Sequence, residues 1–164
     1  IYSPDIPITL HGVSMGAATV LIAAGIHENL VDENSKPNII CCIADSPYDD
    51  IISQVEYLLG ERGNITKKAA IGLFKAIMHL KAKVNVRDAS PITSMANIKL
   101  PIMFIHGEDD RYVLPENSVR LYKACNSNVK ELLLVEGAGH VCSYVLKPYE
   151  YEKAFVSFVV NSIE

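Results

Sequence analysis

The sequence predicts an α/β fold built on a parallel sheet, and three observations predict it. Short apolar runs at residues 6–10, 39–44, 101–105 and 132–135 alternate with longer segments of helical periodicity. These runs contain few polar side chains, as parallel strands covered on both faces do. Loops that carry Ser, Asp or His follow the runs. Because parallel strands end at one edge of a sheet, we expect these polar groups to converge there.

The first run leads directly into Gly12-Val13-Ser14-Met15-Gly16 and then into a segment of small residues. Residues 15–25 are predicted to form a buried helix that ends at Gly25. A strand, G-x-S-x-G and a helix in this order are typical of a nucleophile elbow, a strained turn that presents the serine hydroxyl to a substrate. Glycines on both sides of Ser14 leave room for the turn. The amide of Met15 and the positive end of the helix would then face a developing oxyanion.

Helices are expected in the remaining connections. Residues 49–59 are predicted to form one, and residues 66–83 a second, with Thr66 as its cap. Two more begin at Pro115 and at about Pro148. Since no repeat or linker divides the chain, residues 1–164 are expected to form one domain with a helical insertion at about 48–97.

Candidates for an acid and a base follow the third and fourth strands. His106-Gly107-Glu108-Asp109-Asp110 comes after the third, and Gly137-Ala138-Gly139-His140 after the fourth. A serine needs a neutral imidazole to take its proton, and the imidazole needs a carboxylate to fix its tautomer. The residues alone leave Asp110, Asp109 and Asp45 open as the carboxylate. His11 and His106 are predicted to have supporting roles at strand ends.

With these motifs the chain resembles the carboxyl-terminal portion of an α/β-hydrolase, close to the bacterial serine aminopeptidase and prolyl-oligopeptidase-like esterases. The resemblance implies that Ser14 is the nucleophile, Asp110 the acid and His140 the base, with Met15 in the oxyanion hole. The family pattern H-G-x-x-D-x-x-V favours Asp110 over Asp109, and Asp45 is expected to be structural. In the family an insertion like that at 48–97 forms a lid, which implies an apolar substrate cavity. Its candidate lining residues are Leu73, Phe74, Ile77 and Met78.

The expected function is that of a serine hydrolase, which cleaves carboxylic esters through an acyl-enzyme without a cofactor or metal. A peptidase or thioesterase of the same fold is the alternative within hydrolases, and a non-catalytic relative that acts in binding is the alternative outside them. An intact set of Ser14, Asp110 and His140 argues against loss of catalysis. Whole members of the fold have strands before the nucleophile strand, so we expect a fragment whose second oxyanion donor lies elsewhere.

Composition and charge narrow the possible partners. Hydrophobic residues make up 49% of the chain and charged residues 21%, which is sufficient for a real core. A net charge of -4 argues against nucleic acid and anionic membranes as partners. The partner that the resemblance implies is a small-molecule ester. Four cysteines, two of them adjacent, favour reduced thiols and a cytoplasmic protein. Because an apolar edge strand promotes pairing, we expect the strand at 6–10 to meet a second copy or the missing half of the fold.

Overall fold

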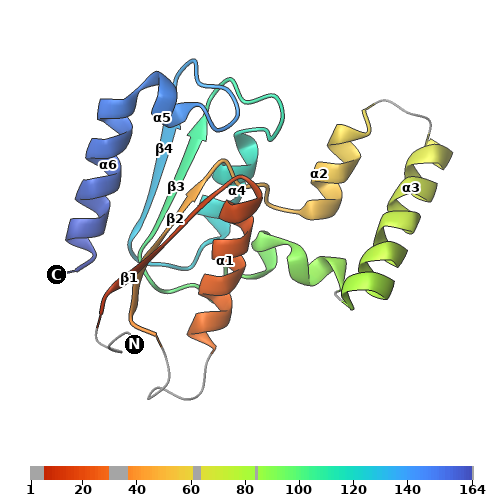
Figure 1. Ribbon diagram of the computed structural model, residues 1–164, viewed down its shortest axis with the longest axis horizontal. Coiled ribbons are helices and arrows are strands. Elements are labelled where there is room, and N and C mark those ends of the chain that lie inside the picture. The colour runs from red at the N-terminus through yellow and green to blue at the C-terminus, as the bar shows by residue number, and fades with distance from the viewer. Residues whose placement is uncertain (1–5, 30–36, 61–63, 84, 164) are drawn as a thin grey trace.

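Four parallel strands form the sheet of the computed structural model, which describes residues 6–29, 37–60, 64–83 and 85–163. The strands lie in chain order β1-β2-β3-β4, and they span Ile8–Val13, Ile39–Asp45, Ile102–Gly107 and Lys130–Val135. β2 and β3 lie in the middle, and every residue of β3 is buried. Val13 of β1 pairs with Asp45 of β2, and Asp45 pairs with Ile105 of β3, so the carboxyl ends of these three strands lie at one edge of the sheet (Figure 1).

Helices cover both faces of this sheet, as Figure 1 shows. On one face α1 (Met15–Glu28) and α4 (Glu116–Ala124) bury Leu21 and Leu121 in a cluster with Phe104. On the other face α6 (Pro148–Asn161) buries Tyr151 and Phe158 against the inner strands. A short helix, α5 (Ser143–Leu146), precedes α6. The predicted α/β fold with a parallel sheet is therefore confirmed, because alternate side chains of the strands supply two separate cores.

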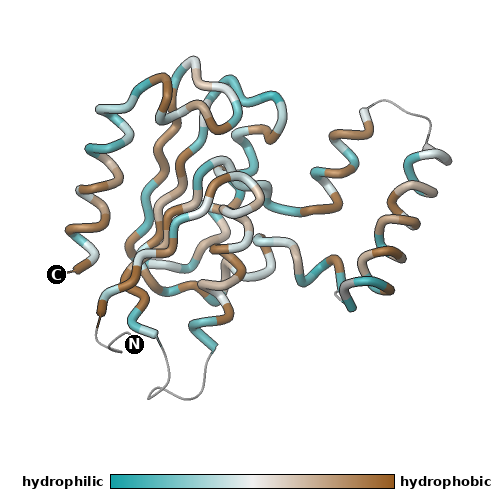
Figure 2. Tube along the Cα trace, in the orientation of Figure 1, coloured by the Kyte–Doolittle hydropathy of each residue, from teal (hydrophilic) through white to brown (hydrophobic). Residues whose placement is uncertain are grey.

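The elements between β2 and β3 extend to one side of the sheet (Figure 1). They comprise α2 (Ile51–Leu58), α3 (Asn64–Ile77), the π-helix η1 (Met78–Ala82) and two short 3-10 helices, η2 (Val86–Ala89) and η3 (Pro91–Thr93). Figure 2 shows hydrophobic stretches along the strands and along α3, and hydrophilic loops above the carboxyl ends of the strands. The assignment of residues 48–97 as a lid stays a prediction.

Several predicted boundaries differ from the structure. β1 begins two residues later than expected, because Pro7 has no N–H for a strand ladder. At its other end β1 extends three residues further than expected, to Val13. The prediction that α1 ends at Gly25 is wrong. The helix continues to Glu28, and the side chain of the following Asn29 donates to the Gly25 carbonyl over 2.8 Å. The single helix expected at 66–83 is divided into α3 and η1.

β1 forms an edge of the sheet. Among the described residues its one strand partner is β2, and the side chain of Ile8 is exposed. Pairing of this edge with a second copy or with a further part of the fold stays a prediction. In the part of the chain that the structure describes, every helix is too short or too polar to cross a lipid bilayer.

Candidate active site

Ser14 lies in a tight turn between β1 and α1. Its φ of 54° and ψ of -118° are outside the regions that L-residues ordinarily occupy. The turn is held because the Ser14 amide donates to the carbonyl of Asp45 over 2.8 Å. A Cβ on Gly12 would lie 2.2 Å from the carbonyl oxygen of Gly16, so the first glycine of the motif is required for space. A Cβ on Gly16 would meet no atom within 4 Å, so the expectation of crowding there is wrong.

The three residues assigned by resemblance lie in series. Ser14 Oγ is 2.9 Å from His140 Nε2, and His140 Nδ1 is 2.6 Å from Asp110 Oδ2. Because Nδ1 faces a carboxylate, it carries the ring proton, and Nε2 is left to accept from the serine hydroxyl. The His140 side chain is 22% exposed while that of Asp110 is fully buried. This hydrogen-bonded series of Ser14, His140 and Asp110, called the relay below, therefore connects a buried carboxylate to an accessible serine hydroxyl.

Hydrogen bonds hold the Asp110 carboxylate in its charged form. Oδ1 accepts from the amides of Tyr112 and Val113, at 2.8 and 2.9 Å. Oδ2 accepts from His140 and also from His106 Nε2 at 3.2 Å. Burial alone would raise the pKa of Asp110, but these four donors outweigh it and hold the pKa at about 2. A permanent negative charge therefore faces the His140 imidazole.

His106, in β3, supports the loop after β3 that carries Asp110, called the acid loop below. Its Nε2 faces two acceptors, Asp110 Oδ2 and the carbonyl of Val113 at 2.9 Å, so this nitrogen carries the proton. Nδ1 then accepts from the buried hydroxyl of Ser118 over 2.7 Å. The fully buried ring of His106 thus joins β3, the acid loop and α4. This placement agrees with the supporting role that the sequence predicted.

The lowered pKa of Asp110 has a consequence for stability. The pKa of an ordinary aspartate, as in the unfolded chain, is 3.8, whereas that of Asp110 in the folded protein is about 2. Between these two pH values the unfolded chain therefore binds a proton at this carboxyl more readily than the folded one. The charge of Asp110 therefore stabilises the fold above this window by about 2 kcal/mol, and this contribution is lost as the pH falls through it. We expect the difference in urea unfolding free energy between the protein and its Asp110→Asn variant to shrink by this amount from pH 5 to pH 2. A difference that stays constant over this range would contradict the assignment.

The rival carboxylates lie outside the relay. Asp45 is buried at the end of β2, where it accepts from Ser46 Oγ at 2.8 Å and from Tyr151 Oη at 3.1 Å. Burial raises its pKa, although the Ser46 and Tyr151 hydroxyls act in the opposite direction. Its partners are hydroxyl groups, and this placement agrees with the structural role expected of it. Asp109 is exposed, and its amide donates to the carbonyl of Ala138. The structure thus places Asp110, and neither rival, beside His140.

Gly107 allows the acid loop to approach the loop after β4 that carries His140. A Cβ at this position would lie 2.2 Å from the carbonyl oxygen of Ala138, a backbone atom that cannot rotate away. The same loops are joined by bonds from Glu108 N to the Val135 carbonyl and from Asp109 N to the Ala138 carbonyl, both 3.0 Å. The glycine of the sequence motif thus has a packing role between β3 and β4.

Substitution of Gly107 by alanine is expected to separate these loops. The added methyl would force the backbone around Ala138 to move, at a cost of about 1–3 kcal/mol of stability as in other overpacked sites. Gly72 is a matched control, because it is exposed in α3 and a Cβ there meets no atom within 4 Å. Gly72→Ala should therefore leave stability unchanged or raise it. Urea unfolding of the two variants checks the difference, and equal stabilities would refute the crowding argument.

A cavity of about 180 Å³ opens beside the Ser14 hydroxyl. Its lining residues come from the elbow, from α2 and its preceding loop, and from the acid loop: Ser14, Met15, Tyr48, Ile51, Gln54, Leu58, Tyr112 and Val113. The side chain of Gln54 donates to the Tyr112 carbonyl over 2.7 Å and so fastens α2 to the acid loop. The Tyr112 ring lies against the His140 ring, with centroids 5.0 Å apart.

The four residues predicted to line the substrate cavity do not line this one. Leu73 and Ile77 are exposed on α3, and Phe74 and Met78 are half-buried at α3 and η1. Sequence reasoning missed the residues of α2, although Ile51, Gln54 and Leu58 are spaced to share one helix face. That spacing was the available signal. Met15, expected in the oxyanion hole, begins α1 next to Ser14, and its side chain also lines the cavity.

Comparisons with known proteins identify the family of the chain. The family model described as serine aminopeptidase, S33 matches residues 59–143. The chain belongs to this family. The matched segment includes Asp110 and His140 and begins after Ser14. Among curated proteins, the uncharacterized protein YqkD of Bacillus subtilis is 29% identical over 154 residues. These residues are 94% of this chain and 48% of YqkD, so the chain spans about half the length of the curated relative that it matches.

Solved structures of hydrolases share the fold of this member of the S33 family. An esterase of Pyrococcus furiosus aligns with a TM-score of 0.63 at 21% identity, over 96% of this chain and 54% of the esterase. A monoacylglycerol lipase of Paleococcus ferrophilus aligns with a TM-score of 0.62 at 19% identity, over 94% of this chain and 68% of the lipase. The sheet and its flanking helices are therefore part of an α/β-hydrolase fold, as the sequence predicted.

Proposed function

We propose that the protein is a serine hydrolase that cleaves carboxylic esters, with Ser14 as nucleophile, His140 as base and Asp110 as the acid that orients it. The observation that carries this proposal is the unbroken chain of hydrogen bonds from Ser14 Oγ to His140 and from His140 to Asp110, at 2.9 and 2.6 Å. A nucleophile, a base and a base-orienting carboxylate at these distances can perform acyl transfer.

In the proposed reaction His140 Nε2 takes the Ser14 proton as Oγ attacks the ester carbonyl. The tetrahedral oxyanion is stabilised by the Met15 amide, which lies at the amino end of α1 where backbone N–H groups have no intrahelical acceptor. A second donor is expected from outside the described residues. His140 then protonates the leaving alcohol, and the acyl-enzyme is hydrolysed when a water molecule, deprotonated by the same imidazole, attacks it.

The cavity beside Ser14 suggests short acyl groups. Its volume of about 180 Å³ corresponds to roughly six water molecules. Ile51, Leu58 and Val113 supply apolar walls, and Gln54 and Tyr112 supply polar atoms. We therefore propose these five side chains as substrate contacts, in place of the four expected on α3 and η1.

Peptide hydrolysis is the second candidate, because the matching family model is described as a serine aminopeptidase. The same relay attacks esters and amides, so the two candidates differ in the leaving group that the site accepts. Initial rates on a p-nitrophenyl ester and on aminoacyl p-nitroanilides, measured with the full-length protein, separate them. If the protein is an esterase, it should hydrolyse the ester and leave the anilides intact.

Fluorophosphonate labelling tests the proposed nucleophile directly. We expect a stoichiometric mass increase on the peptide that contains Ser14, because the relay makes this hydroxyl far more nucleophilic than an ordinary serine. The Ser14→Ala variant should remain unlabelled, whereas Ser157→Ala, a change on the exposed face of α6, should be labelled as the parent is. Labelling that survives in Ser14→Ala, or its absence from the unaltered protein, would favour a non-catalytic relative.

A further inference from the structure

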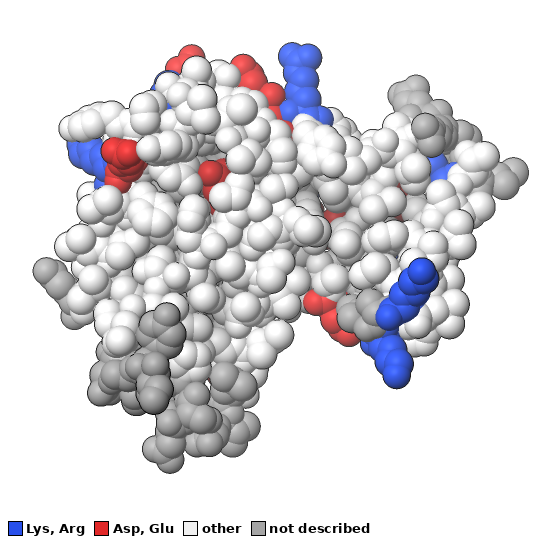
Figure 3. Space-filling view, viewed as in Figure 1, with Lys and Arg blue, Asp and Glu red and all other residues white. Residues whose placement is uncertain are grey.

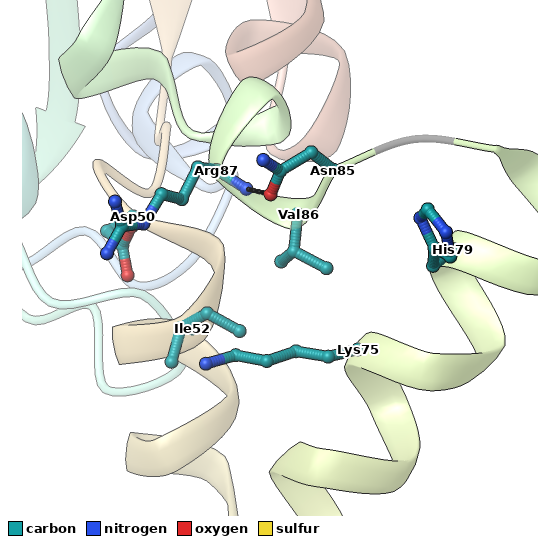
Figure 4. Close-up of a pocket in the computed structure, with 7 residues that line it drawn as sticks. All are labelled: Asp50, Ile52, Lys75, His79, Asn85, Val86 and Arg87. Carbon is teal, nitrogen blue, oxygen red and sulfur yellow. Dashed lines mark hydrogen bonds between the residues drawn. The ribbon is translucent and has the colours of Figure 1, made fainter.

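A second and larger cavity lies away from Ser14. It has a volume of about 490 Å³, is open to solvent, and is lined by residues of α2, α3, η1 and η2 and the residues that precede α2 and η2. Figure 4 shows its lining residues, which are Asp50, Ile52, Lys75, His79, Asn85, Val86 and Arg87. α2 separates it from the cavity at Ser14, because Ile51, Gln54 and Leu58 face the nucleophile while Ile52 lines the second cavity. The relay therefore makes no use of this space.

Nitrogen-bearing side chains from three elements face into this cavity. The Lys75 ammonium extends from α3 across to α2, and Arg87 enters from η2 and extends toward Asp50 (Figure 4). His79 comes from η1 on the far side. Within the described residues, no carboxylate forms a salt bridge with the ammonium of Lys75 or the guanidinium of Arg87. These donors are the groups that recognise phosphate and carboxylate oxygens.

The one carboxylate in the lining is already committed to holding α2. Asp50 Oδ1 accepts from the Ser53 amide and Oδ2 from the Ser90 hydroxyl, both at 2.7 Å. Burial would raise the pKa of Asp50, but the bonds from Ser53 and Ser90 outweigh it and leave the pKa below its usual value. Both carboxylate oxygens thus have donors of their own, and the helix cap explains the presence of Asp50 without a ligand.

The wider charge pattern points to an anion as well. Residues 64–87 contain six of the 15 basic residues of the chain and none of its 19 acidic residues, although the net charge of the chain is -4. Basic side chains project from this side of the molecule near the end of α3 and η1 (Figure 3). Such a concentration of one sign raises the local concentration of anions. Ile52 and Val86 add apolar surface within the cavity.

We propose that this cavity is a binding site for a small anion that carries a short apolar group, with a phosphate or carboxylate head. Lys75 and Arg87 bind the charged head, and the apolar group lies against Ile52 and Val86. The site is separate from the proposed catalytic relay and does not depend on it. Loss of Ser14 therefore leaves it intact.

Calorimetric titration of the full-length protein tests the site with butyl phosphate, butyrate, inorganic phosphate and 1-butanol as probes. We expect one equivalent of butyl phosphate or butyrate to bind, more tightly than inorganic phosphate, and 1-butanol not to bind. The tighter of the two organic anions identifies the head group. Because the Ser14→Ala variant keeps the cavity, it should bind as the parent does, so failure of the proposed hydrolase and failure of this site give different results.

Two variants locate the binding. Lys75→Gln and Arg87→Gln each remove one charged hydrogen bond, so each should weaken binding by about tenfold or more. Lys123→Gln on the exposed face of α4 is the matched control and should bind unchanged. Thermal unfolding of each variant establishes that it is folded. Affinities equal to that of the parent in folded Lys75→Gln and Arg87→Gln, tight binding of 1-butanol, or no binding of either organic anion at millimolar concentration would overturn the proposal.

Discussion

Replacement of His140 by alanine is expected to lower kcat for an activated ester on the order of 10⁶-fold. The imidazole accepts from Ser14 Oγ over 2.9 Å and is the one base within hydrogen-bond distance of that hydroxyl among the described residues. Without it the serine has no group to take its proton as the carbonyl is attacked. Fluorophosphonate labelling should fall in parallel, since it uses the same activated hydroxyl. Stopped-flow or steady-state ester hydrolysis by the full-length protein checks both effects.

A second histidine provides the control for this experiment. His11 is exposed at β1, and its Nε2 lies 3.4 Å from Tyr151 Oη, outside the relay. His11→Ala should therefore change kcat by less than about tenfold, the effect of a neutral hydrogen bond. The His140 side chain is partly exposed, so its removal leaves the core packing in place. A folded His140→Ala variant with the parent's kcat would remove this residue from the proposed mechanism.

Much of the fold follows from local patterns in the sequence. The apolar runs that became β2, β3 and β4 are buried between two layers of helices, so their hydrophobicity reports their position directly. The helix boundaries were harder to predict, because they depend on contacts that are distant in sequence. Gly25 is an example: a Cβ there would lie 2.7 Å from the Cβ of Ser94, so this glycine within α1 makes room for a segment distant in sequence and does not mark the end of the helix.

The positions around Ser14, Asp110 and His140 are predictable because strand ends meet at one edge. Each group follows a strand directly, and the order of the strands fixes which loops are neighbours. The cavity is different, because its walls depend on how α2 leans on the acid loop. That contact is made by a bond from the Gln54 side chain to the Tyr112 carbonyl, a pairing that no spacing in the sequence indicates. The apolar residues of α3 and η1 that were expected to line this cavity therefore do not line it.

Exchange of Asp110 for asparagine is expected to lower kcat by about 10⁴-fold while KM changes little. The amides of Tyr112 and Val113 keep an oxygen at the Oδ1 position, so the new NH₂ group replaces Oδ2. It then faces His140 Nδ1 as a donor. The imidazole has to accept there, which moves its proton to Nε2. An Nε2–H cannot take the proton of Ser14, and the relay is broken although its geometry is preserved.

The two rival carboxylates supply the controls. Asp109→Asn alters an exposed side chain that is adjacent in sequence, and Asp45→Asn alters a buried carboxylate whose partners are Ser46 and Tyr151. Both variants should keep kcat within about tenfold of the parent, because neither carboxylate touches His140. Steady-state kinetics with an activated ester separates the three variants in one experiment. A loss in Asp45→Asn as large as that expected for Asp110→Asn, in a protein of unchanged unfolding free energy, would transfer the acid role to the end of β2.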